Sequence, residues 1–537
     1  MTSGYIINNI ILPLDASFSE AFSVAEKKLE KIGVKSFVET LKIYKKSIDA
    51  RRKNDIKFVY SVLALGSFPE LNDSILKTSG ISKYKVETPD FRIGSKALNS
   101  DIVVVGSGPA GLFAALTLAE AGFKPILIER GGSVEERRSA IKQFEKTRVL
   151  DTSTNIQFGA GGAGTFSDGK LVTRIADSMS SYILSRLVEF GAPAEIEFLS
   201  RPHIGTDILS NVVSNILDRI VSLGGEVRFH TTLIGYNETA GRITSVVTDK
   251  GSIPCSLVVL AVGHSARDTY SLLINHGADL IAKPFSVGMR IEHPTELIDR
   301  GLYGDFAGHP ELGHAEYNLS YNTKERGVYT FCMCPGGEVV AATSEEGGVV
   351  TNGMSYHSRS GKNSNSAVLC SVFREDYGST PMAAIDFQRE IERQAFRVGG
   401  VDYSAPYCTV GDFLSNNYST SFSRVQPTYM HGSVKLADPE KYLPHFVADH
   451  IRRGIVHFDK KIPGFASSDA ILTGAETRTS APIRIVRNNE TRLATGFANL
   501  YPAGEGAGYA GGITSAAIDG LKTALKVISI YKPNVCG

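Results

Sequence analysis

This chain of 537 residues has few cysteines and no long apolar run, and each absence excludes a class of protein. The six cysteines are scattered, so without a secretory signal we expect reduced thiols rather than a disulfide framework. No segment approaches the roughly 18 consecutive apolar residues of a membrane helix. The N-terminal segment MTSGYIINNIILPL lacks a basic start, and its apolar run is too short for export. We therefore expect a cytoplasmic location and no membrane partner.

The chain also lacks an excess of either charge. It has 57 Lys and Arg residues and 56 Asp and Glu residues, which give a formal net charge of +1. The net charge therefore does not indicate nucleic-acid binding. One local stretch, KKSIDARRKND, is basic. It could bind nucleic acid or a protein, or it could be a solvated hairpin tip. No RNA-binding aromatic signature accompanies it, so the solvated tip is favoured. The basic residues are Lys45, Lys46, Arg51, Arg52 and Lys53.

The strongest pattern that is present is a dinucleotide-binding βαβ unit over residues 101–132. An apolar strand leads into GSGPAG, and a helix-forming run and a second apolar strand follow. Gly106 allows a tight turn, Gly108 leaves room for a pyrophosphate, and Gly111 lets helix and strand pack closely. The helix start offers N–H groups to phosphates. Glu129, 23 residues after Gly106, is placed to hydrogen-bond ribose hydroxyls.

Two further glycine-rich stretches extend this pattern. NIQFGAGGAGTFSDGKL has four glycines in six positions (159–164), too many for a helix or strand interior. It is either a flexible loop or a second backbone cradle, and its place after the nucleotide unit favours the cradle. Asp168 and Lys170 in this stretch could face the cofactor or the substrate. Near the end, PAGEGAGYAGGITSAAIDG predicts a glycine loop and a helix from Ile513 to Ile530, aimed at a polar or anionic group.

The predicted fold class is α/β, with three kinds of domain. Residues 1–95 predict a β-α-β-β-α-β, ferredoxin-like module of the α+β type. Residues 96–280 and 466–537 predict two parts of one Rossmann-like domain. Residues 281–465 depart from βα alternation, so we expect a β-rich inserted substrate domain there. Its polar segment 350–366 could be a mobile lid.

Three side chains are candidates for binding a substrate or moving protons: His264, Arg290 and Glu292. His264 directly follows a buried strand, although it could instead cap a loop. Arg290 could bind a carboxylate bidentately, or pair with Glu292 across strands. Cys332 and Cys334 would share one face of a strand. They could be redox active, but buried thiols are favoured, and no Cys/His cluster has the spacing of a metal site.

The order of these motifs resembles a known family. GSGPAG, GAGGAGTFSDGKL, GGEVRF, LAVGHSA and PAGEGAGYAGGITSAAIDG occur in the order of the FAD flavoproteins of the glutathione-reductase superfamily. More narrowly, the chain is similar to the FAD-dependent dehydrogenase or NAD(P)/FAD-dependent oxidoreductase group, in which stretches like KPFSVGMRIEH and FCMCPGG recur. The resemblance covers almost the whole chain. It implies that FAD, rather than free NAD, is the bound dinucleotide.

The resemblance also implies where FAD would lie. The motif glycines would meet the pyrophosphate, Glu129 the adenosine ribose, and the backbone of Leu233 the adenine. The start of the last helix would sit beside the flavin ring and stabilise its anionic reduced form. The residues expected to bind the cofactor are Gly106, Gly108, Pro109, Ala110, Gly111, Glu129, Arg130, Gly161, Gly162, Thr165, Leu233, Ala261, Gly263, Gly504, Glu505, Gly512 and Ile513.

Departures from related subfamilies limit the expected reaction. No cysteine lies between Asp101 and Pro254, so a CxxxxC redox disulfide is not expected. Residues 504–507 replace the GDAAH-like motif of aromatic hydroxylases. Without a second GxGxxG unit, NAD(P)H could bind only transiently. We therefore expect an FAD-dependent oxidoreductase that transfers a hydride between flavin and a small organic substrate. A flavoprotein acting on RNA and a non-catalytic flavin-binding scaffold remain alternatives, and the sequence indicates no particular oligomeric state.

Overall fold

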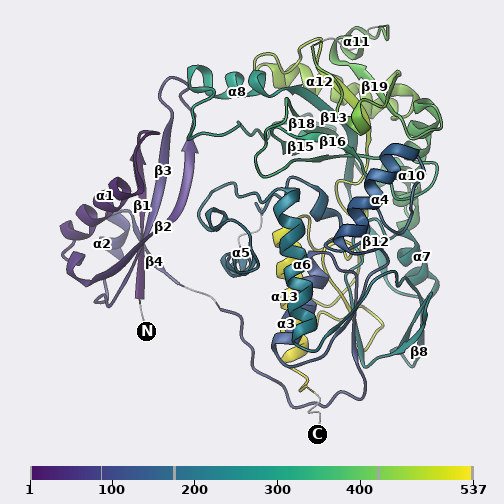
Figure 1. Ribbon diagram of the computed structural model, residues 1–537, viewed down its shortest axis with the longest axis horizontal. Coiled ribbons are helices and arrows are strands. Elements are labelled where there is room, and N and C mark those ends of the chain that lie inside the picture. Colours follow the sequence, from purple (N-terminus) through teal and green to yellow (C-terminus); the bar gives the residue numbers. More distant parts are fainter. Residues whose placement is uncertain (1–2, 86–87, 173–176, 420–423, 534–537) are drawn as a thin grey trace.

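Three sheets organise the fold, as the ribbon in Figure 1 shows. The computed structural model describes residues 3–85, 88–172, 177–419 and 424–533. A small N-terminal sheet stands to one side, a parallel sheet carries the dinucleotide motif, and a seven-stranded sheet forms the third part. In the described part of the chain, no helix is both long and apolar enough to cross a bilayer.

The N-terminal sheet confirms the predicted ferredoxin-like order. Its elements are β1 (Ser3–Leu12), α1 (Phe18–Lys31), β2 (Val38–Asp49), β3 (Lys57–Gly66), α2 (Asp73–Thr78) and β4 (Ile81–Tyr84). The strands are antiparallel in the order β2-β3-β1-β4. Helix α1 buries Ala21, Ala25 and Leu29, which are spaced four residues apart and therefore lie on one face. The sequence predicts the last strand of this module near Lys83–Glu87, and residues 86–87 lie outside the described residues.

The basic stretch between β2 and β3 is partly used for contacts within the chain. The Nζ atom of Lys46 lies 4.0 Å from the centre of the Phe58 ring and 3.5 Å from a carboxylate oxygen of Glu311. Lys53 donates a hydrogen bond of 2.5 Å to the carbonyl of Gly301. Lys46 and Lys53 therefore fasten the N-terminal sheet to the rest of the molecule, whereas residues 51–55 form an exposed turn, in agreement with the favoured solvated tip.

The parallel sheet brings three loops to one edge. Its strands, in the order β23-β11-β5-β6-β7, are β5 (Ile102–Val105), β6 (Ile126–Ile128), β7 (Glu226–Arg228), β11 (Leu257–Leu260) and β23 (Leu500–Pro502). Val105 pairs in register with Leu260, and Leu260 with Pro502. Because these are the last residues of adjacent parallel strands, the loops that follow them leave from the same edge, where α/β sheets bind ligands.

Close helix packing at this edge depends on two glycines. Helix α3 (Pro109–Glu120) follows β5, and α13 (Ile513–Ile528) packs beside it. A Cβ atom on Gly111 would lie 1.8 Å from the carbonyl oxygen of Gly106. A Cβ atom on Gly520 would lie 2.0 Å from the carbonyl oxygen of Ala110. Neither distance is compatible with a side chain, so both positions require glycine.

The seven-stranded sheet forms the predicted β-rich region. In the order β14-β15-β18-β13-β21-β19-β20, its strands are β14 (Ser320–Asn322), β15 (Gly327–Cys334), β18 (Asn363–Val372), β13 (Phe285–Pro294), β21 (Ile471–Glu476), β19 (Ala405–Thr409) and β20 (Val434–Leu436). Strand β21 lies beyond the predicted boundary at residue 465, yet it pairs with β13 and β19. We therefore propose that this domain extends through β21.

The remaining elements connect and cover these sheets. The helices are α4 (Val134–Thr147), α5 (Ser180–Glu189), α6 (Thr206–Ser222), α7 (Arg267–Asn275), α8 (Thr295–Tyr303), α9 (Arg374–Tyr377), α10 (Pro381–Gly399), α11 (Val410–Ser415) and α12 (His445–Asp459). The strands are β8 (Leu233–Thr239), β9 (Arg242–Thr248), β10 (Gly251–Pro254), β12 (Leu280–Ala282), β16 (Glu338–Ala341), β17 (Thr351–Met354) and β22 (Ile483–Ile485).

The prediction of a mobile lid over residues 350–366 is wrong. The segment contains β17 and the start of β18, and several of its polar side chains are buried. The Ser355 hydroxyl donates to Asp168, and the Arg359 guanidinium forms an ion pair with the same carboxylate. Buried polar groups need hydrogen-bond partners. The polar composition of the segment therefore reflects contacts with buried polar partners and does not indicate a solvated loop.

The substitution Gly520→Ala tests the helix crossing. In an ordinary helix interior, alanine is more stable than glycine by up to about 1 kcal/mol. Here we expect a loss of at least about 2 kcal/mol, because the new methyl group would overlap the Ala110 carbonyl. Urea unfolding measures the change. The control is Gly235→Ala, whose Cβ would meet nothing closer than 3.6 Å. Equal stability of Gly520→Ala and wild type would contradict the packing.

Candidate functional site

A cavity of about 1540 Å³, its open mouth included, lies at the carboxyl edge of the parallel sheet. Three glycine loops line it: the first (106–111), the second (159–164) and the third (504–512). Residues of β15 and β21 from the seven-stranded sheet, and of β17 from a two-stranded sheet with β16, also line it. The cavity thus lies between the parallel sheet and strands from another part of the fold.

Most of the predicted cofactor-binding residues line this cavity. They are Gly106, Gly108, Pro109, Ala110, Glu129, Arg130, Gly162, Leu233, Ala261, Gly263, Gly504, Glu505, Gly512 and Ile513. Gly111, Gly161 and Thr165 are not among its described lining residues. A Cβ atom on Gly161 would lie 2.0 Å from the Thr165 hydroxyl oxygen. These three residues lie behind the cavity lining. Neighbouring protein atoms leave no room for a side chain at Gly111 or Gly161.

The first two glycine loops form a cradle that fits a pyrophosphate. A Cβ atom on Gly162 would lie 3.0 Å from the Cα of Gly108, so a side chain there would close the passage between the loops. Helix α3 begins at Pro109, and α13 begins at Ile513; both starts line the cavity. Two helix N-termini and side-chain-free backbone are the features that bind the phosphates of a dinucleotide.

Glu129 lies at the cavity wall, as predicted, and also ties the loops together. Its Oε2 atom accepts hydrogen bonds from the backbone N–H and the hydroxyl of Ser107, at 2.8 and 2.7 Å. Its Oε1 atom accepts from the backbone N–H groups of Gly131 and Gly159, both at 3.0 Å. One carboxylate therefore joins the first glycine loop to the second, a role that the sequence pattern did not reveal.

Asp519 holds the third glycine loop in a similar way. It accepts a hydrogen bond of 2.8 Å from the backbone N–H of Gly504 and a bidentate pair of 2.7 and 2.9 Å from Arg487. Burial favours its neutral form, but the hydrogen bonds from Arg487 hold the pKa of Asp519 below its usual value. The loop that follows β23 is thus fixed by a side chain of α13.

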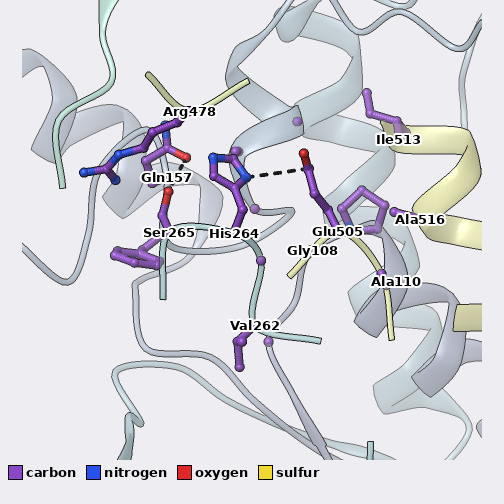
Figure 2. A pocket seen from close by; sticks show the side chains of 18 of the residues that line it. Gly108, Ala110, Gln157, Val262, His264, Ser265, Arg478, Glu505, Ile513 and Ala516 are labelled. Carbon is purple, nitrogen blue, oxygen red and sulfur yellow. Dashed lines mark hydrogen bonds and ion pairs between the residues drawn. The ribbon is translucent and has the colours of Figure 1, made fainter. Parts of the chain in front are cut away.

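His264 and Glu505 meet at the centre of the cavity lining, as Figure 2 shows. The Nδ1 atom of His264 lies 3.6 Å from Glu505 Oε2. The other ring nitrogen, Nε2, is buried and has no hydrogen-bond partner in the described part of the chain. The two residues follow β11 and β23, so the register of the parallel strands brings them together.

Arg290 and Glu292 are not among the described residues that line the cavity, and their contact with substrate stays a prediction. The buried Arg290 guanidinium donates to the Cys332 carbonyl at 2.9 and 3.0 Å, and its Nε lies 3.3 Å from Glu476. Glu292 accepts a 2.7 Å hydrogen bond from the Thr428 hydroxyl. Both residues lie on β13, which pairs with β18 and β21 in the sheet, and Gly353 of β17 packs against the Arg290 guanidinium.

Two residues outside the predicted set form part of this wall. Glu476 is 4% exposed and lines the cavity at the end of β21; burial raises its pKa, although the nearby Arg290 opposes the shift. Cys332 is exposed toward the cavity, whereas Cys334 is buried, and both are free thiols. The expectation that they share a strand face fails because Cys332, at a φ of 42°, interrupts the pairing of β15 with β18. A polar residue after a buried apolar strand was the signal for Glu476, as for His264.

Asp168 and Lys170 also line the cavity, in agreement with their predicted orientation. Asp168 is paired with Arg359, and the interactions with this guanidinium keep the pKa of the buried carboxyl low against the effect of burial. Lys170 donates to the Met333 carbonyl and lies 3.5 Å from Glu316. These contacts attach the end of the second glycine loop to the opposite sheet.

Three family models match parts of the chain. The model described as "FAD binding domain" matches residues 101–140, and "FAD-dependent protein, C-terminal domain-like" matches residues 284–479. A "Domain of unknown function (DUF8436)" matches residues 5–64. The first covers the dinucleotide motif, the second covers the seven-stranded sheet, and the third falls on the N-terminal sheet.

Individual proteins extend these matches. An "Uncharacterized protein" of Clostridium beijerinckii is 47% identical over 531 residues, which are 98% of each chain. A 2,4-dichlorophenol 6-monooxygenase of Delftia acidovorans is 26% identical over 157 residues, 28% of this chain and 27% of that protein. Among solved structures, L-amino acid deaminase from Proteus vulgaris is 13% identical with a TM-score of 0.33, covering 82% of this chain and 96% of the deaminase.

The substitution Glu129→Gln tests the role of the carboxylate. An amide would turn one of the two acceptor oxygens into a donor that faces N–H groups. We expect FAD affinity to fall by at least about tenfold. Titration of the flavin-free protein with FAD, followed by flavin fluorescence, measures this change. The control is Glu490→Gln at an exposed site. Wild-type affinity in Glu129→Gln would contradict the assignment.

The matches and the geometry agree on the cofactor. A relative with 47% identity over 98% of both chains shows a shared family. The two FAD models fall on the two parts of the chain whose residues line the cavity. The cradle between the glycine loops fits the dinucleotide that these models describe. The chain therefore belongs to the same family as the Clostridium beijerinckii protein, and the models that match it are those of an FAD-binding domain and of the C-terminal domain of FAD-dependent proteins.

Proposed function

We propose that this protein transfers a hydride between FAD and a small organic substrate. One observation carries the proposal: the cavity joins the nucleotide cradle to a wall of the seven-stranded sheet that bears Glu476 and Cys332. A cofactor held at the cradle would thus have its reactive end near titratable side chains. FAD supplies the hydride chemistry when bound, and the protein supplies positioning and proton transfer.

The residues that would hold FAD follow from the cavity lining. The backbone of Gly108 and Gly162 and the start of α3 would bind the pyrophosphate. Glu129 would contact the ribose, and Leu233 the adenine. The start of α13 at Ile513 would stabilise negative charge on the flavin ring.

Two groups in the cavity are suited to hold or move a proton. Glu505, 3.6 Å from Nδ1 of His264, would orient the imidazole so that Nε2 can exchange a proton with the substrate. Glu476 is a buried carboxyl whose pKa is raised by burial, and a raised pKa makes its carboxylate form a stronger base toward the substrate. Arg290 would position Glu476 from behind.

The alternatives are less well supported. The contacts of Lys46 and Lys53 within the chain speak against RNA docking on the basic stretch. A non-catalytic scaffold would have no need for a proton-exchanging carboxyl at the cavity. Transient NAD(P)H remains part of the proposal as an electron donor, and so does a cytoplasmic location.

Anaerobic reduction of the bound flavin tests the proposed reaction. We expect the purified protein to be yellow and to lose its visible absorption on addition of NADH, NADPH or a member of a panel of small amines, amino acids and hydroxy acids. Dithionite provides the control for full reduction. An FAD-loaded protein that dithionite bleaches but no organic donor reduces would favour the scaffold.

The substitution Glu476→Gln tests the carboxyl at the wall. With the donor found above, we expect flavin reduction to slow by about 100-fold or more, the scale of general acid–base catalysis, with unchanged FAD content. If Glu476 acts as a base, the wild-type rate falls as the pH falls through its raised pKa, because protonation removes the base. Stopped-flow reduction across pH measures this limb. Persistence of the same limb in Glu476→Gln would exclude this role.

A further inference from the structure

A buried cation lies behind the second glycine loop. Arg137, on α4, has no exposed surface. Its guanidinium donates to the carbonyls of Asn155, Ile156, Ala160 and Gly162. All five of these hydrogen bonds go to backbone oxygens of one segment, residues 155–162. Arg137 therefore fixes the conformation of this loop through all three nitrogens of its guanidinium group.

This cation makes no ion pair of 4.0 Å or less within the described residues, and the Phe166 ring lies 4.6 Å from it. Burial lowers the pKa of Arg137 to about 9, and the charge of the buried Glu129 opposes the shift, so the group remains charged at neutral pH. A buried charge is costly unless an opposite charge compensates it. Glu129 is a buried anion that does so within the protein, and an anion at the cradle would add a second.

The peptide after Gly162 connects Arg137 to the cavity. Its carbonyl accepts a 3.0 Å hydrogen bond from Arg137. In a planar trans peptide the N–H points opposite to the carbonyl, so the N–H of Ala163 points away from Arg137. Gly162 and Ala163 line the cavity, and Gly162 faces Gly108 of the first glycine loop. The peptide dipole thus has its negative end at Arg137 and its positive end toward the pyrophosphate cradle.

We propose that Arg137 is the buried counter-charge of the cofactor, a positioning residue that aims the Gly162 peptide and acts through it on the FAD pyrophosphate. The residue would not touch FAD, because it is not among the described residues of the cavity wall. Its charge, which Glu129 already opposes in the flavin-free protein, would be compensated further when the pyrophosphate binds.

The substitution Arg137→Gln, compared with Arg137→Lys, separates charge from loop structure. We expect FAD binding by the flavin-free full-length protein to weaken by about 100-fold in Arg137→Gln but only by about tenfold in Arg137→Lys, which keeps the charge. Riboflavin, which lacks the pyrophosphate, should lose less than threefold in either variant. Arg138→Gln, at an exposed site on the same helix, is the matched control and should bind FAD as wild type does. Equal losses for FAD and riboflavin, or for Gln and Lys, would overturn the proposal.

A measurement on the wild type covers the case in which Arg137→Gln does not fold. Inorganic pyrophosphate should raise the melting temperature of the flavin-free wild-type protein above the value in sulfate of equal ionic strength. In Arg137→Lys most of this rise should persist, whereas adenosine should raise both melting temperatures equally. No extra stabilisation by pyrophosphate in the wild type would overturn the proposal.

Discussion

The carboxylate of Glu129 is the interaction on which the cofactor edge depends. Four donors from three segments converge on its two oxygens, so it fixes the first glycine loop, the turn after β6 and the second glycine loop at once. No side chain at Gly162 could take over this role, because its Cβ atom would lie 3.0 Å from the Cα atom of Gly108. Arg137 acts on the same loop from the opposite side, through carbonyls instead of N–H groups. The cradle is thus held by one buried anion and one buried cation.

The second constraint is the alignment of two sheets. The parallel sheet provides the cradle, and the seven-stranded sheet provides the wall that bears Glu476. A buried ion-pair network joins them: Arg267 follows β11, Arg478 follows β21, and both bind Glu392 of α10. Arg290 adds a layer behind the wall, where it holds Glu476 and the chain at residue 332. In the proposed function, this pairing of cradle and wall would bring substrate and cofactor together.

Local patterns predicted the cradle well and the wall poorly. The glycine loops, the strand ends before His264 and Glu505, and the ferredoxin-like order all depend on near neighbours in sequence. The burial of Arg290 and Glu292 outside the described cavity lining could not be predicted, because alternation along a strand gives two faces without showing which one meets a cavity. The supposed lid at 350–366 is held by contacts such as that of Arg359 with Asp168, 191 residues earlier, and no local pattern reports such a pairing.

The most direct test is a crystal structure of the protein with FAD bound. The account predicts the adenine against Leu233, the pyrophosphate between Gly108 and Gly162, and the flavin ring between the start of α13 and the wall at Cys332 and Glu476. A flavin ring outside this wall, or a pyrophosphate away from the first two glycine loops, would contradict it.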